Sequence, residues 1–171
     1  PSDELGEEIV GLGDFDGDGY SDLAVSAPGV TFGSGQVQIL YGGAQGISSA
    51  GSITLTAGFL GGFGDGLGDA GDVNGDGYAD LVVGAPNANN AAGEAYVYYG
   101  RSARSAPAAA LTVAGSSNGN LGYDVTGLGD LNGDGFADLA LGEPYADPDA
   151  TGAVLVYYGR ATVPVLATTL V

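Results

Sequence analysis

Three short stretches of this sequence place carboxylate and amide side chains at alternating positions, a pattern that can hold a metal ion. They run from Asp14 to Asp22, from Asp72 to Asp80 and from Asp130 to Asp138, with oxygen-bearing side chains at positions 1, 3, 5 and 9. The residue at position 7 offers its backbone carbonyl. Calcium takes about six to eight oxygen ligands, so a loop with this spacing can wrap one ion. The predicted ligands are Asp14, Asp16, Asp18, Tyr20, Asp22, Asp72, Asn74, Asp76, Tyr78, Asp80, Asp130, Asn132, Asp134, Phe136 and Asp138.

Two other interpretations of these loops fit less well. An EF-hand begins in a similar way but requires a bidentate Glu at position 12, where this chain has Val25, Val83 and Leu141. A single Asp- and Gly-rich stretch could be a plain polar turn. Three identical spacings disfavour that reading, and the sequence therefore predicts three Ca²⁺ ions per chain. The extra carboxylate at Asp16 predicts that the first loop binds at least as tightly as the others.

The loops belong to an internal repeat. Asp14 recurs as Asp72 and again as Asp130, a step of 58 residues each time, and the similarity extends well beyond the loops. Each unit reads as four short extended segments, which in the first unit lie near residues 5–12, 22–27, 35–41 and 53–57. The second segment of each unit is apolar at successive positions, which is typical of a strand covered on both faces. The predicted fold is an all-β propeller of three four-stranded antiparallel blades in one domain, 1–171, with blades near 1–58, 59–116 and 117–171.

The first segment of each unit is rich in glycine, as at Gly11, Gly68 and Gly127. Innermost strands of a propeller crowd together near its axis, so these glycines are expected to relieve steric contact. The repeated tyrosines Tyr41, Tyr99 and Tyr158 are expected to pack between blades, in the core, rather than to stack on a ligand.

Composition restricts the function. The 21 acidic residues against 3 arginines give a formal charge of -18, which repels nucleic acid and anionic lipid. There is no cysteine or histidine, which removes thiolate and imidazole sites, and no apolar run long enough to span a bilayer. Seven of the other acids are expected to be solvated surface charge, and the arginines solvent-facing charge. The acids are Glu7, Glu8, Asp65, Asp69, Glu94, Asp124 and Glu143; the arginines are Arg101, Arg104 and Arg160.

The repeat resembles a known family. Leu5-Gly6, Phe63-Gly64 and Leu121-Gly122 open the units, the Asp-x-Asp/Asn-Gly-Asp-Gly-x-x-Asp loop follows, and Gly84-Ala85-Pro86 closes the middle one. Together they are similar to the FG-GAP repeats of the integrin α-chain propeller. The resemblance implies four-stranded blades and calcium in the loop between the two inner strands. Ser26 and Glu143 depart from the closing motif, so those turns are expected to differ slightly.

The number of blades is the larger departure, because propellers of that family typically have seven and this chain supplies three. Two chains arranged head to tail are expected to close a six-bladed homodimer; a piece of a longer propeller is the alternative. The start at Pro1 fits a mature form, an excised fragment or a designed chain.

Three functions are left open by the sequence. The first is a non-catalytic, extracellular or cell-surface module for binding or adhesion, with a protein or glycan ligand and no enzyme activity. The second is an accessory or scaffold domain of a secreted carbohydrate-active or other enzyme, disfavoured because no His, Cys or Lys can act as a base. The third is an assembly unit whose main property is to close a propeller.

Overall fold

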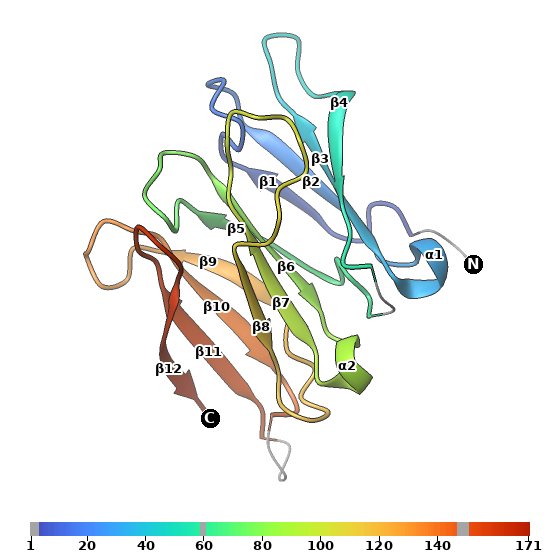
Figure 1. Cartoon of the computed structure of the whole chain (residues 1–171), viewed down its shortest axis with the longest axis vertical. Coiled ribbons are helices and arrows are strands. Elements are labelled where there is room, and N and C mark those ends of the chain that lie inside the picture. Colours follow the sequence, from blue (N-terminus) through green and yellow to red (C-terminus); the bar gives the residue numbers. More distant parts are fainter. Residues whose placement is uncertain (1–3, 59–60, 147–150) are drawn as a thin grey trace.

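The structure is a computed structural model and describes residues 4–58, 61–146 and 151–171. Within these ranges twelve strands form three separate sheets, each a four-stranded antiparallel meander in chain order (Figure 1). Blade 1 contains β1 (Ile9–Leu12), β2 (Asp22–Ala27), β3 (Gln36–Tyr41) and β4 (Ser48–Leu55). Blade 2 contains β5 (Gly66–Gly71), β6 (Asp80–Ala85), β7 (Glu94–Tyr98) and β8 (Leu111–Ala114). Blade 3 contains β9 (Val125–Gly129), β10 (Asp138–Glu143), β11 (Ala153–Tyr158) and β12 (Val165–Leu170).

The predicted fold class is confirmed for the three four-stranded antiparallel blades. The boundaries of the first and fourth strands of blade 1 differ slightly from the expectation: β1 begins at Ile9 because residues 5–8 form a turn, and β4 already begins at Ser48. Two helical turns, α1 (Val30–Gly33) and α2 (Ala88–Ala91), connect the second and third strands of blades 1 and 2. Among the described residues no helix is long and apolar enough to cross a membrane.

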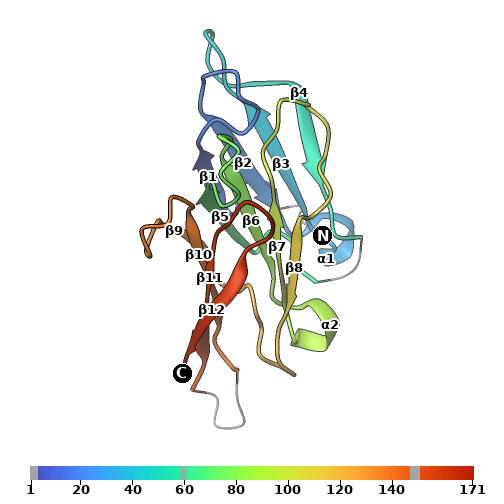
Figure 2. The same cartoon turned by 60° about the vertical axis from the view of Figure 1, so that its left-hand side comes forward.

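The blades are stacked face to face, and the core lies between them (Figure 2). One buried cluster joins blades 1 and 2 and a second joins blades 2 and 3. The central strand β6 is buried at every position, as its apolar sequence predicts for a strand between two neighbours. The inner strands β5 and β9 are in close contact: a Cβ added to Gly127 would lie 2.4 Å from the Asp69 carbonyl oxygen. Crowding therefore explains Gly127, whereas a Cβ at Gly11 in β1 meets no atom within 4 Å.

Each seam between blades repeats the same contacts. The residue pair that opens a blade packs on the preceding blade, where Phe63 and Leu121 are fully buried. The Phe63 backbone lies against Gly35, and the Leu121 backbone forms a parallel bridge with Gly93. Burying such a side chain contributes about 1.5–3 kcal/mol. The opening pair therefore fills the space between successive blades.

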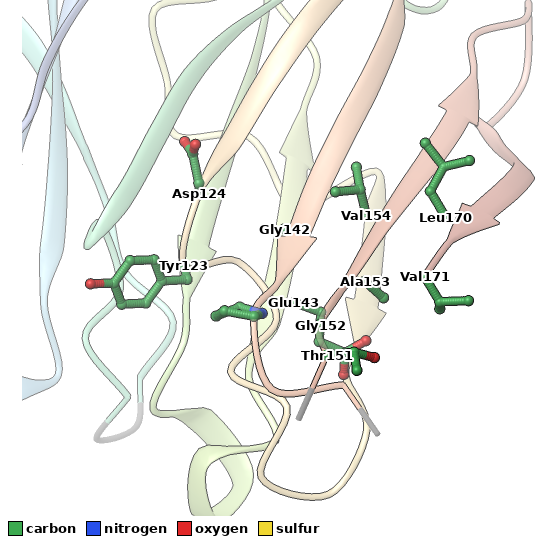
Figure 3. Close-up of a pocket in the computed structure, with 11 residues that line it drawn as sticks. Tyr123, Asp124, Gly142, Glu143, Thr151, Gly152, Ala153, Val154, Leu170 and Val171 are labelled. Atoms are coloured by element: carbon green, nitrogen blue, oxygen red, sulfur yellow. The ribbon is translucent and has the colours of Figure 1, made fainter. Parts of the chain in front are cut away.

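The outward face of blade 3 has a hollow of the kind that receives such a pair, and we call this hollow the seat (Figure 3). Gly142 and Gly152 occupy the positions that Gly84 and Gly93 hold in blade 2, and they line a hollow of about 500 Å³ beside Val154 and Leu170. At the other end of the stack Leu5, the counterpart of Phe63, is 64% exposed.

The repeated tyrosines follow the same trend. Tyr41 is buried, Tyr99 is half-buried and Tyr158 is 37% exposed. The expectation that all three are core is therefore correct for Tyr41 and wrong for Tyr158, because no described blade lies beyond β11 on that side. Burial at this position depends on the neighbouring blade and not on the strand itself.

Candidate metal centres

The three acidic loops connect the first and second strands of each blade and adopt one conformation. In the first loop Gly17 and Gly19 have φ angles of 77° and 90°, which side chains other than glycine rarely adopt. The corresponding glycines of the other loops have nearly the same angles. This backbone turns successive N–H groups toward the loop interior, where the carboxylates accept them.

The aspartate at position 1 organises each loop. In the first loop Asp14 Oδ1 accepts hydrogen bonds from the amides of Gly17 (2.6 Å) and Asp18 (3.0 Å), and its Oδ2 accepts one from Gly19 (2.7 Å). Asp72 and Asp130 accept the same three bonds in their own loops. These three amide hydrogen bonds hold the position 1 carboxylate in the same orientation in each loop.

Positions 3 and 5 complete the cluster of oxygens. In the first loop the carboxylates of Asp14, Asp16 and Asp18 have oxygens within 4.8 Å of one another. In the other two loops position 3 is an asparagine, whose Nδ2 donates to the position 5 aspartate: Asn74 to Asp76 and Asn132 to Asp134, both at 2.9 Å. The donor set is entirely oxygen, which is the chemistry that calcium prefers.

Position 9 has a second, structural role. Asp22, Asp80 and Asp138 are buried, and each carboxylate accepts one amide of its own loop and one amide just after the third strand. For Asp80 these donors are Val73 and Gly100, both at 2.9 Å. Burial, only partly offset by these bonds, raises the pKa of Asp80 to about 7, and Asp76 and Asp72 add to the rise. Position 9 lies outside the close carboxylate cluster of the first loop.

The aromatic residue at position 7 links each loop to the one before it. The Tyr78 ring lies over Gly17, where a Cβ would come within 2.4 Å of the ring, and the Phe136 ring lies over Gly75 in the same way. Tyr20 in blade 1 is instead exposed. Sequence reasoning assigned only the carbonyls of these residues and missed the role of their rings, although the aromatic type at position 7 of all three loops was a signal.

Comparison with known proteins agrees with the division of the chain into three repeats. A family model described as FG-GAP repeat matches residues 8–40, 64–98 and 121–157, one match in each blade. The chain belongs to the FG-GAP repeat family. This confirms the resemblance inferred from the opening pair, the loop and the closing motif.

Integrin alpha chains are among the proteins to which this chain is similar. Integrin alpha-PS5 of Drosophila melanogaster is 33% identical over 180 residues, covering 97% of this chain and 17% of the relative. Human integrin alpha-IIb is 45% identical over 91 residues (52% and 9%), and mouse integrin alpha-7 is 40% identical over 94 residues (53% and 8%). This chain thus spans less than a fifth of the length of these relatives.

Arg104 is a site residue that sequence reasoning missed. It was expected to be solvent-facing charge, yet its guanidinium bonds Asp16 and Asp18 of the first FG-GAP loop from the neighbouring blade. The separation in sequence is 88 residues for Asp16, so no local pattern announces the contact. Asp16 raises the pKa of Arg104, chiefly through this hydrogen bond.

Two of the other acids are also not the solvated charges that were expected. Glu143 is buried and accepts a bond from the Ser116 amide, and Glu94 accepts bonds from Asn89 and Tyr96. The Glu143 carboxylate reaches back from blade 3 to the segment that follows β8. In the sequence Glu143 departs from the FG-GAP closing motif. In the structure its hydrogen bond connects blade 3 to the end of blade 2.

Proposed function

We propose that this chain is a calcium-stabilised, non-catalytic FG-GAP propeller module in which each of the three loops holds one Ca²⁺. The fifteen predicted residues supply the ligands: side-chain oxygens at positions 1, 3, 5 and 9 and the carbonyls of Tyr20, Tyr78 and Phe136. The observation that carries the proposal is the shared conformation of the loops in all three blades. In the first loop, oxygens of the residues at positions 1, 3 and 5 lie within 4.8 Å of one another. The role of the ion is electrostatic, because clustered carboxylates repel one another without a cation.

Thermal unfolding in calcium and in chelator tests this proposal. A ligand that binds only the folded state at a hundredfold excess over its Kd stabilises by about 2.7 kcal/mol per site. The melting temperature is therefore expected to rise clearly in calcium. An Asp14→Asn, Asp72→Asn, Asp130→Asn variant should lose most of the rise, whereas Asp124→Asn, outside the loops, should keep it. Equal melting temperatures in calcium and chelator would refute the proposal.

The biological role proposed is binding or adhesion outside the cell or at its surface, where millimolar calcium keeps moderate sites filled. The supporting observation is kinship with integrin alpha chains. A protein or glycan is the proposed ligand class. Binding of the calcium-loaded chain to a protein or glycan array, lost in chelator, is the expected result; hydrolysis of a glycan substrate would instead favour the accessory enzyme domain.

A second candidate function, assembly, is favoured by the seat on blade 3. We propose that the exposed Leu5-Gly6 pair of a second copy enters the hollow beside Gly142 and Gly152, as Phe63-Gly64 and Leu121-Gly122 pack on blades 1 and 2. The matching apolar residue at loop position 2 supports this: Phe15 and Val73 are buried under the next blade, whereas Leu131 is 59% exposed. Two copies related by a twofold axis then close a six-bladed homodimer.

Light scattering during size-exclusion chromatography of the 171-residue chain tests the assembly. The expected mass is twice 16.7 kDa. Leu5→Asp is expected to give monomers. Ile47→Asp, at an apolar side chain that is 50% exposed just before β4, should leave the dimer intact. A monomer at all concentrations, or dissociation by both variants alike, contradicts the proposed seat.

A further inference from the structure

The first metal loop contains a cation of the protein itself. Arg104 lies in the connection between β7 and β8 and reaches across the seam to blade 1. Its Nε donates to Asp16 Oδ2, and its Nη2 donates to Asp18 Oδ2 at 2.8 Å. The guanidinium also lies over the ring of buried Tyr41, 4.5 Å from the centroid. The ring and the two carboxylates fix its position, although 42% of the side chain is exposed.

Arg104 bonds the carboxylate oxygens of Asp16 and Asp18 that accept no hydrogen bond from the loop backbone. Asp16 Oδ1 already accepts the Asp18 amide at 3.2 Å, and Asp18 Oδ1 accepts the Tyr20 amide at 3.0 Å. The second oxygen of each carboxylate is therefore the one best available to a bound ion, and in both residues it is bonded to the guanidinium. A divalent ion that bound through these two oxygens would meet the guanidinium at both of them.

The other two loops have an asparagine at position 3, where the first loop has Asp16. There a neutral asparagine at position 3 donates to the position 5 aspartate, a bond that Asp16 cannot make. The four carboxylates of the first loop with the Arg104 guanidinium have a net charge of -3, the same as the three carboxylates of either other loop. The pair Asp16 and Arg104 thus takes the place of one asparagine and keeps the three loops equal in formal charge.

We propose that Arg104 is an intramolecular competitor of calcium in the first loop, and that it cancels the gain in affinity that the extra Asp16 carboxylate provides. The proposal rests on the proposed function, since it requires calcium in this loop. Because binding of the ion must loosen the guanidinium, occupancy of the first loop is coupled to the contact between blades 1 and 2. By linkage, a firmer seam lowers the affinity of the loop for calcium.

Amide NMR during a chelator-buffered calcium titration reads each loop separately. The signals of Gly17 and Gly19 report the first loop, and those of Gly75, Gly77, Gly133 and Gly135 report the other two. In Arg104→Gln the half-saturation of Gly17 and Gly19 is expected at about tenfold lower calcium, the order of effect of one positive charge removed beside a surface ion. The other loops, measured in the same sample, should not move.

Two further variants make the result specific. Arg160→Gln removes the same charge, but its Nε bonds the Val163 carbonyl in blade 3, so the first loop should not change. The double variant Asp16→Asn, Arg104→Gln copies the other loops, and Gly17 should then titrate together with Gly75. Arg104→Gln with unchanged or weaker affinity in the first loop, or an equal shift in Arg160→Gln, overturns the proposal. If no loop of the unmodified chain responds to calcium, the proposed function itself fails.

Discussion

A methyl group added to one inner-strand glycine should destabilise the stack, while the same change at the equivalent position of another blade should not. Gly127 in β9 and Gly11 in β1 pair with equivalent residues of their second strands, Leu139 and Leu23. A Cβ at Gly127 would lie 2.4 Å from the Asp69 oxygen and 3.0 Å from Ala70, both backbone of blade 2. Because backbone atoms cannot rotate away, Gly127→Ala forces the blades apart.

The expected cost of Gly127→Ala is about 1–3 kcal/mol, the range for overpacking. For a domain of this length that lowers the melting temperature by roughly 2–4 °C per kcal/mol. Gly11→Ala meets no atom within 4 Å and restricts the unfolded chain, so it should be neutral or stabilise by up to about 1 kcal/mol. Denaturant unfolding of dilute, monomeric protein compares the two variants. Equal free-energy changes for both would refute the reasoning that inter-blade crowding selects these glycines.

Three further perturbations probe other contacts. Phe63→Ala should cost about 3–5 kcal/mol of unfolding free energy, because the ring is fully buried against Tyr96 and Tyr98. A cost below about 1 kcal/mol in denaturant melts would contradict the role of Phe63 in filling the space between blades 1 and 2. Asp80→Ala leaves two buried amides without an acceptor and should cost about 2–4 kcal/mol of unfolding free energy in chelator, where calcium makes no contribution. An unchanged unfolding free energy in chelator would contradict the structural role of the Asp80 carboxylate. Burial, with Glu7 and Glu4 nearby, raises the pKa of Asp65 to about 6. The folded state then keeps a proton that the unfolded state has released, so the unfolding free energy should fall as the pH rises from about 4 to about 6. Asp65→Asn should make this slope less steep and leave the part that comes from Asp80.

Much of the fold could be predicted because the information is local and repeated. The period from Asp14 to Asp72 to Asp130 sets the number of blades, and turn residues at fixed offsets separate the strands. The continuous apolar character of β6 correctly indicated a strand covered on both faces. The loop glycines could also be predicted, since glycine adopts positive φ angles far more readily than other residues.

The remaining features depend on contacts between blades, which no local pattern encodes. Arg104 pairs with a residue 88 positions away, whereas the guanidinium of Arg101, three residues earlier, bonds Ser105 in its own connection. Tyr41 and Tyr158 occupy equivalent positions but differ in burial because one faces another blade. Glu143 looked like a deviation in a motif, yet its carboxylate is held by a backbone amide of the preceding blade.

The central claim is that each of the three equivalent loops captures one divalent cation. Anomalous diffraction from crystals grown with calcium counts and places these ions directly. The account predicts three peaks per chain, one in each loop, within about 2.3–2.6 Å of the oxygens at positions 1, 3 and 5. Loops without a peak at saturating calcium would contradict it.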